Sequence, residues 1–191
     1  MKTLVIIDAQ NDFCEDGALP VNGGKEVCRK ISEELIGKYD AYIATQDWHP
    51  FNHCSFKENG GMWPAHCVVD TKGAEICSDI IYSLTKEKQL LFVETKGTEP
   101  EKEEYGANFS DSFLDSVKDY FELCSATKNK ENIYDVVGLA YDYCVKESAK
   151  NLKKNRPDSI VNVLFGYTAS VDSSSSEAVK KELEEAGVNV V

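Results

Sequence analysis

The histidines of this 191-residue chain are confined to one segment. His49, His53 and His66 lie between positions 48 and 67, and Asp47 stands two residues before the first of them. Two imidazoles and one carboxylate form a ligand set for Zn, Fe or Mn that leaves positions open for water or substrate. Asp47, His49 and His66 are therefore the candidate ligands of one divalent metal ion. His53 and Glu58 are either further ligands or groups that orient the first three, and the competing interpretation is a polar loop without metal.

Cys144 stands where a strand is expected to turn into a helix. It follows the apolar run 136–140 by four residues. N–H groups in the first turn of a helix are unpaired and the helix dipole is positive there, so a thiolate is favoured and the pKa of a thiol can fall. This position predicts a reactive thiol beside N–H groups suited to an oxyanion. Cys28, Cys77 and Cys124 are instead expected to be buried and inert.

Two charged residues complete a set for acyl transfer. Asp8 ends the apolar run 4–7, and Lys96 follows the apolar run 90–94. Taken singly, Asp8 is an ordinary turn carboxylate and Lys96 an ordinary surface lysine. Together with Cys144 they supply a base for the thiol proton, a cation that stabilises the thiolate, and a nucleophile. The chemistry that fits this set is acyl transfer through a thioester.

These residues need a framework that brings distant segments together. Short apolar runs that end in polar residues predict strands, and helical periodicity or capping residues predict helices between them. The expected strands are 2–8, 41–45, 90–94, 133–138, 159–165 and 188–191. The expected helices are 23–38, 76–84, one capped near Ser110 or Asp111, 143–152, and one that opens with the capping box Ser174-x-x-Glu177 and ends at Gly187.

This alternation predicts an α/β fold. We expect a single domain over residues 1–191 with three α/β/α layers, in which helices flank a mainly parallel six-stranded sheet. Asp8, Asp47, Lys96 and Cys144 each follow a different expected strand. Because ligands bind beyond the carboxyl ends of such strands, one crevice can hold all four side chains. Residues 46–67 have no regular period and are expected to form the metal-binding loop.

Composition excludes several kinds of partner. The formal net charge of −12 argues against nucleic acid or an anionic membrane as the main partner. No apolar run approaches the length of a membrane span, and the first residues lack the apolar stretch of a secretory signal. Seven cysteines without a C-x-x-C pair favour free thiols in a reducing compartment. We therefore expect a cytoplasmic protein that acts on a small molecule.

Five segments together resemble one enzyme family. They are residues 7–14 (IDAQNDFC), 46–50 (QDWHP) with His53, 63–67 (WPAHC), 95–97 (TKG) and 138–146 (GLAYDYCVK). In this order they resemble the nicotinamidases (pyrazinamidases) among the isochorismatase-like cysteine hydrolases, from residue 4 to about residue 190. The resemblance implies a parallel sheet flanked by helices and metal-dependent hydrolysis of nicotinamide to nicotinate and ammonia, as in NAD salvage. Pyrazinamide is a further expected substrate.

The resemblance also implies roles for residues already singled out. It implies a catalytic triad of Asp8, Lys96 and Cys144, and a divalent metal on Asp47, His49 and His66 with His53 near it. Zinc is the expected ion, with iron and manganese as alternatives. A homo-oligomer is left open.

Further implied roles concern the substrate. The backbone N–H groups of Ala140 and Cys144 would hold the oxyanion, with a cis peptide before Ala140. Phe13, Trp63 and Tyr105 would enclose the flat ring.

Two alternatives stay open on the sequence alone. Related cysteine amidases act on carbamoyl compounds such as N-carbamoylsarcosine or ureidoacrylate, and they do not need the Asp-x-His…His set. A non-catalytic protein of the same fold would bind metal or a partner, or sense oxidation through its thiols. Metal-dependent release of ammonia from nicotinamide would separate these cases.

Overall fold

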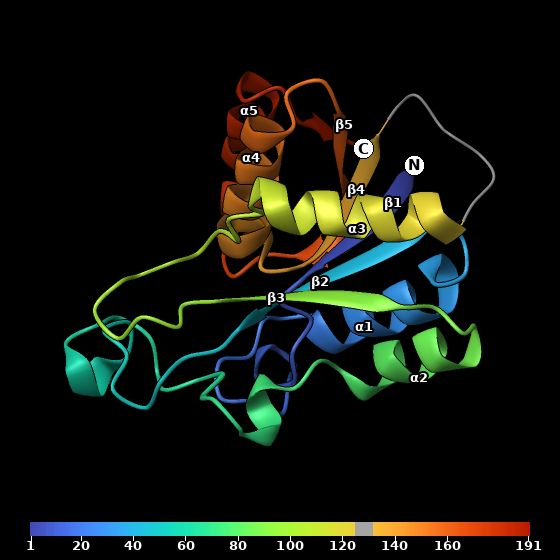
Figure 1. Ribbon diagram of the computed structural model, residues 1–191. Coiled ribbons are helices and arrows are strands. Elements are labelled where there is room, and N and C mark those ends of the chain that lie inside the picture. Colours follow the sequence, from blue (N-terminus) through green and yellow to red (C-terminus); the bar gives the residue numbers. More distant parts are fainter. Residues whose placement is uncertain (125–131) are drawn as a thin grey trace.

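One parallel sheet runs through the centre of the molecule (Figure 1). The structure is a computed structural model that describes residues 1–124 and 132–191. The strands lie in the order β3-β2-β1-β4-β5-β6, and every neighbouring pair is parallel. Their bounds are Lys2–Ile7 (β1), Ala41–Asp47 (β2), Leu91–Lys96 (β3), Ile133–Leu139 (β4), Ile160–Ala169 (β5) and Asn189–Val190 (β6). The expected α/β fold with six parallel strands is confirmed.

Helices cover both faces of the sheet, as Figure 1 shows. Their bounds are Gly24–Lys30 (α1), Ser78–Lys86 (α2), Asp111–Cys124 (α3), Lys146–Asn155 (α4) and Ser176–Glu185 (α5). The helices α1 and α2 pack on one face, and α3, α4 and α5 on the other. Among the described residues, no helix combines the length and the apolar character that crossing a membrane requires.

The central strand β1 explains why the sheet is covered twice. Leu4 and Ile6 point into the core beneath α1 and α2, whereas Val5 and Ile7 point into the core on the opposite face. All four side chains are completely buried. A continuous apolar run, rather than an alternating one, is typical of a parallel strand between two helical layers.

The turn before α4 differs from the expected start of a helix at residue 143. Residues Tyr141–Val145 form a π-helical turn, and α4 begins at Lys146. Two N–H groups, those of Tyr143 and Val145, donate to the same carbonyl of Ala140, each at 3.1 Å. Cys144 thus lies in a widened turn between β4 and α4, a local geometry that is frequent at functional sites.

The capping box predicted for the last helix is wrong. Asp172, rather than Ser174, is the capping residue: its Oδ1 accepts hydrogen bonds from the N–H and the hydroxyl of Ser174, at 2.9 and 2.7 Å. A 3-10 turn over Ser173–Ser175 then leads into α5. The reason is local, since a carboxylate two residues upstream satisfies the first free N–H before the serine can.

The order of the strands brings the predicted polar residues to one edge. Asp47 and Lys96 are the last residues of β2 and β3 and lie side by side in register. Asp8 follows β1, and Cys144 follows β4 by five residues. The excursion between β2 and α2 extends to one side of the sheet, at the left of Figure 1. It carries the three histidines.

The backbones of β1 and β4 approach each other closely at Gly138. Its φ is +116°, and a Cβ there would lie 2.0 Å from the carbonyl oxygen of Ile7. We expect Gly138→Ala to lower the free energy of unfolding by about 1–3 kcal/mol or more, because the strands must separate locally. Gly60→Ala is the matched control, since Gly60 also has a positive φ, +93°, and its Cβ would meet nothing within 4 Å. Urea denaturation of both variants measures the difference, and equal stabilities would contradict this packing argument.

Candidate active site

A pocket opens at the carboxyl ends of the strands, the usual place for a small-molecule site in a parallel sheet. Eight of its lining residues are ones that the sequence singled out: Phe13, Asp47, His49, Trp63, His66, Tyr105, Ala140 and Cys144. Asp8 and Lys96 are buried next to Cys144, with exposed fractions of 0% and 3%. The structure therefore brings the expected triad and the expected metal ligands together.

Lys96 is the centre of the buried polar group. Its Nζ lies 2.8 Å from Oδ2 of Asp8 and 3.5 Å from Sγ of Cys144, and it donates a short hydrogen bond to Oδ1 of Asp47. Thr45 donates its hydroxyl proton to the other oxygen of Asp8. Oδ2 of Asp8 thus forms the ion pair with Lys96, and as a carboxylate oxygen it has a further lone pair for the thiol proton.

The charges of this group depend on one another. Burial lowers the pKa of Lys96, but the Asp47 and Asp8 carboxylates outweigh it, so the ammonium is retained. Burial raises the pKa of Asp47, yet Lys96 and His49 together hold it below its ordinary value. Asp8 behaves differently: burial raises its pKa, and Lys96 only partly opposes the rise, to which Asp47 adds. Asp47 thus stays a carboxylate, while Asp8 has a higher proton affinity than a free aspartate.

The thiol of Cys144 does not show the lowered pKa that its position predicted. Burial raises its pKa well above the ordinary value, and the nearby carboxylates of Asp8 and Asp47 add to the rise, whereas Lys96 opposes it. The prediction took account of the helix N-terminus, but not of burial or of the two nearby carboxylates. The resting group is a thiol, so its proton must leave when it attacks.

The two histidines of the metal set have the same orientation. Nδ1 of His49 lies 2.9 Å from the carbonyl of Gly97, and Nδ1 of His66 lies 2.8 Å from the carbonyl of Pro64. Because carbonyl oxygens only accept, each Nδ1 carries the proton and each Nε2 is free to bind a metal. Ligand atoms of Asp47, His49 and His66 all lie within 4.8 Å of one another, and all three side chains are buried. These residues fit a divalent metal ion.

Neither of the two further metal candidates joins this group. Both ring nitrogens of His53 are engaged, Nδ1 with the hydroxyl of Ser55 at 2.7 Å and Nε2 with the carbonyl of Lys102 at 3.0 Å. Its ring stacks on that of His49, with centroids 4.2 Å apart. Glu58 is exposed on the surface. His53 therefore supports the His49 ring, as an orienting residue would.

A glycine, itself held by a glutamate, fixes the His49 ring. Gly97, with φ +62°, accepts the His49 Nδ1–H, and its own N–H donates to Oε2 of Glu104 at 3.1 Å. A Cβ at this position would lie 2.3 Å from Cε1 of the His49 ring. Only a residue without a side chain lets the backbone approach the imidazole so closely.

The remaining walls of the pocket are largely aromatic. The indole N–H of Trp63 donates to the hydroxyl of Tyr105 at 3.1 Å, and both rings lie against Tyr143, with centroid separations of 5.2 and 5.3 Å. Phe13 packs against His66. The peptide between Leu139 and Ala140 is cis, as the resemblance implied.

Sequence reasoning missed several residues of the site. Tyr143, Glu103 and Glu104 line the pocket. The charged run 99–104 is the solvated loop that its composition predicts, exposed over residues 99–103, and only Glu104 is partly buried. Gln10 holds the backbone of Asp47 on both sides, since its amide donates to the Asp47 carbonyl and accepts from the Asp47 N–H, each at 2.8 Å. The position of Tyr143 directly before Cys144 was a usable signal, whereas nothing local to residues 103 and 104 indicated that they lie at the pocket.

Comparisons with known proteins agree with this geometry. No protein-family model matches the chain. The chain is 31% identical over its whole length to the nicotinamidase/pyrazinamidase of Mycobacterium tuberculosis, of which it covers 98%. The chain belongs to the nicotinamidase family. Solved structures similar to this nicotinamidase-family chain include PnC1 from L. infantum in complex with nicotinate, at 32% identity and a TM-score of 0.80. The alignment covers 100% of this chain and 92% of that one.

A second similar structure bears on the metal. The pyrazinamidase of Pyrococcus horikoshii in complex with zinc is 30% identical, with a TM-score of 0.77, and the match covers 100% of this chain and 98% of that one. Together with the ligand set described above, it supports a divalent metal in this member of the nicotinamidase family.

Gly97 gives a direct test of the metal set. We expect Gly97→Ala to weaken zinc binding by about 10–100-fold, because the new methyl group displaces the His49 ring. Gly60→Ala is the matched control: Gly60 also has a positive φ, +93°, but its Cβ would meet nothing within 4 Å. Zinc titration of the metal-free proteins measures both affinities. Equal losses in the two variants would show that backbone strain, rather than contact with His49, is responsible.

Lys96 gives a test with a defined pH dependence. In the metal-free Lys96→Met variant, Asp8 and Asp47 are buried without their cation, so their folded-state pKa values rise above the unfolded ones. Groups with raised folded pKa values stabilise the fold at low pH and lose that contribution as the pH rises. We therefore expect the stability deficit relative to the parent chain to grow between about pH 5 and pH 8. Urea denaturation across this range measures it, and a deficit independent of pH would contradict the charge argument.

Proposed function

We propose that this chain hydrolyses nicotinamide to nicotinate and ammonia through a cysteine thioester, with pyrazinamide as a further substrate. The observation that carries the proposal is that a buried thiol, ammonium and carboxylate meet at one pocket with an Asp-His-His metal set. The related proteins support the substrate class, since PnC1 from L. infantum was crystallised with nicotinate. The reaction belongs to the salvage of NAD.

We propose zinc as the metal ion, held by Asp47, His49 and His66. The zinc complex of the related pyrazinamidase supports this choice, and nitrogen and oxygen ligands of this kind suit zinc. When bound, the ion offers a coordination position for the ring nitrogen of a pyridine substrate. His53 and Gly97 keep the His49 ring in place for it.

The aromatic walls fit a flat heterocycle. Phe13 lines one part of the pocket, and Trp63 and Tyr105, joined by their hydrogen bond, line another. Aromatic contacts add about 0.5–1.5 kcal/mol per pair beyond the burial of apolar area. These three side chains would orient the ring so that its carboxamide reaches Cys144.

Attack begins with a proton transfer inside the buried group. Asp8 takes the proton of the Cys144 thiol, and its raised proton affinity suits it to this task. The Lys96 ammonium, 3.5 Å from the sulfur, stabilises the thiolate as it forms. The sulfur then bonds to the amide carbon, and the carbonyl oxygen becomes an oxyanion. In our proposal the backbone N–H groups of Ala140 and Cys144 hold that oxyanion.

Two further steps complete the reaction. The protonated Asp8 returns its proton to the leaving nitrogen, so that the C–N bond breaks and ammonia departs from the thioester. Asp8 is then a carboxylate again and takes a proton from a water molecule, which attacks the thioester carbon. The C–S bond breaks, nicotinate leaves, and Cys144 regains its proton.

Two wider proposals accompany this function. We propose that residues 1–191 act as a single hydrolase domain, supported by the one sheet that supplies all four strand ends of the site. We also propose that the protein works in the cytoplasm. The thiols of Cys14, Cys28, Cys54, Cys67, Cys77 and Cys144 are free, which suits a reducing compartment.

Ammonia release from nicotinamide tests the function directly. Cys144→Ala is expected to lower kcat by at least about a thousandfold, because Cys144 carries the one thiol among the described residues that line the pocket. Zinc affinity should be unchanged, since Cys144 is not among the three ligands. Chelation should abolish turnover by the parent chain, and zinc should restore it. Hydrolysis retained by Cys144→Ala would overturn the mechanism, and no hydrolysis by the zinc-loaded parent would overturn the substrate assignment.

A further inference from the structure

Three cysteines meet outside the candidate active site. Sγ of Cys28 lies 2.9 Å from Sγ of Cys77, and Sγ of Cys14 lies 3.4 Å from Cys77 and 3.9 Å from Cys28. The three residues are far apart in sequence, and we call them the cysteine cluster. All three thiols are free. The mechanism proposed above uses none of them.

The cluster joins three separate segments of the fold. Cys14 follows the 3-10 turn Asn11–Phe13 after β1, Cys28 lies on α1, and Cys77 is the residue that precedes α2. Cys28 and Cys77 are buried, with exposed fractions of 2% and 6%. Both cysteines were expected from the sequence to be buried and inert, and their spacing did not indicate that they would meet. The side chain of Cys124 lies outside the described residues.

The triangle of sulfur atoms has the dimensions of a metal site. Sides of 2.9, 3.4 and 3.9 Å place a point about 2.0 Å from all three atoms, within their plane. A point about 1.1 Å above that plane is then about 2.3 Å from each sulfur, which is the usual Zn–S distance. In a tetrahedral site with this Zn–S distance the sulfurs lie about 3.8 Å apart, so the Cys28 and Cys77 sulfurs would separate by about 0.9 Å when the ion binds. Three thiolates and one open position result. A disulfide, by contrast, would join two of them and leave the third unused.

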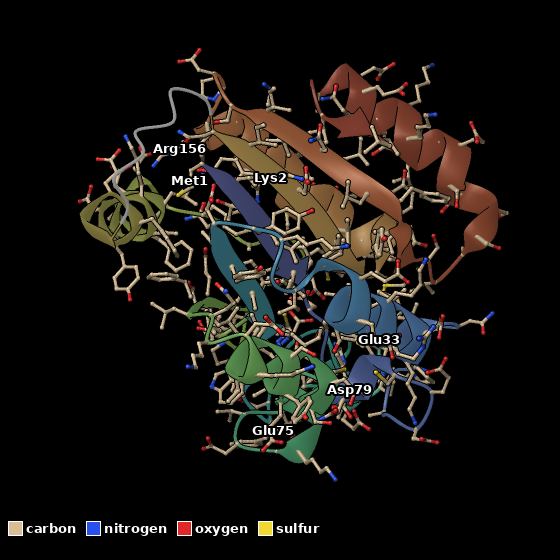
Figure 2. The ribbon with its side chains drawn as sticks, turned by 90° about the vertical axis from the view of Figure 1, so that its right-hand side faces the viewer. Met1, Lys2, Glu33, Glu75, Asp79 and Arg156 are labelled. Atoms are coloured by element: carbon tan, nitrogen blue, oxygen red, sulfur yellow. The ribbon has the colours of Figure 1, made fainter. Side chains whose placement is uncertain are left out.

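A surface depression gives an ion access to the cluster. It reaches all three cysteines and is lined by three carboxylates and two ammonium groups, those of Asp12, Asp16, Asp79, Lys25 and Lys72. Figure 2 shows Asp79 on the side of the molecule where α1 and α2 lie together. Cys77 is the residue that caps the N-terminus of the nine-residue helix α2, so its side chain is held at a fixed point of the fold.

We propose that Cys14, Cys28 and Cys77 bind one thiophilic metal ion, of which Zn²⁺ is the representative, with a water molecule or a carboxylate from the depression as the fourth ligand. Soft thiolate ligands select such ions over Mg²⁺ or Ca²⁺. On binding, three S–H bonds break, three metal–sulfur bonds form, and three protons pass to water. No oxidant or reductant is required.

The bound ion would hold the pocket wall in place. Cys14 directly follows Phe13, which lines the pocket. The N–H of Cys77 donates to the carbonyl of Ala9, next to Asp8, at 2.8 Å. A metal bridge would therefore tie the segment between Asp8 and Phe13 to α1 and α2. The site is distinct from the Asp47-His49-His66 set, and the inference does not depend on the proposed hydrolysis.

Cobalt(II) is the probe that separates the two metal sites. Thiolate ligands give Co²⁺ an intense near-ultraviolet charge-transfer absorption, which carboxylate and imidazole ligands do not give. We expect the full, reduced chain to show this absorption with one equivalent of Co²⁺ bound at the cluster, and to bind two Zn²⁺ ions in total at saturation. The variant His49→Ala/His66→Ala should keep the absorption while it loses the other ion.

Variants of the cluster decide the outcome. Cys14→Ala/Cys77→Ala should lose the absorption and one Zn²⁺ equivalent, whereas Cys54→Ala, which removes a free thiol outside the cluster, should lose neither. If the double variant does not fold, Cys14→Ala alone changes only the half-buried ligand, and it should weaken Co²⁺ binding by at least about 100-fold. Absence of the absorption in the fully reduced parent would overturn the proposal, as would its persistence in Cys14→Ala/Cys77→Ala. One further outcome would overturn it: the metal-saturated protein holds no ion at the cluster, and Cys28 and Cys77 form a disulfide in air.

Discussion

The burial of one ammonium between two carboxylates is the interaction on which the site depends. Lys96 is removed from water together with Asp8 and Asp47, and each of these charges would be costly to bury alone. The sheet order makes the arrangement stable, because β3, β2 and β1 are neighbours and deliver Lys96, Asp47 and Asp8 to adjacent positions. The thiol joins them from β4, the next strand.

Asp47 links chemistry with substrate placement. One of its oxygens accepts from Lys96, and the other lies 3.6 Å from Nε2 of His49. The same carboxylate therefore belongs to the ion-paired group that activates the thiol and to the set that would hold the metal. Gln10 bonds to the backbone N–H and carbonyl of Asp47, so the residue that has both roles has little freedom to move. A substitution in the metal ligand set is therefore expected to affect the ion-paired group around Lys96, and the reverse.

The sequence was most informative where structure follows from local pattern. Buried β-branched runs predicted the strands, and the rule that carboxyl ends of parallel strands meet predicted that Asp8, Asp47, Lys96 and Cys144 would assemble. It failed where the outcome depends on three-dimensional surroundings. Burial and the carboxylates of Asp8 and Asp47 raise the pKa of Cys144, and the Glu104 carboxylate meets the N–H of Gly97, seven residues earlier in the chain. The cysteine cluster could not be foreseen either, since residues 14, 28 and 77 have no spacing typical of a metal motif.

The central position of β1 has a consequence for biosynthesis. Residues 1–96 contain β1, β2 and β3, so half of the sheet and three of the charged groups emerge from the ribosome first. The other edge of β1 pairs with β4, which begins at residue 133. Before β4 is synthesised, that edge exposes unpaired backbone beside apolar side chains. Such an edge is the part of a nascent chain most prone to associate with another strand. The nucleophile at position 144 follows β4 in the chain, so a chain that stops before it carries the charges of the site but not the thiol that they activate.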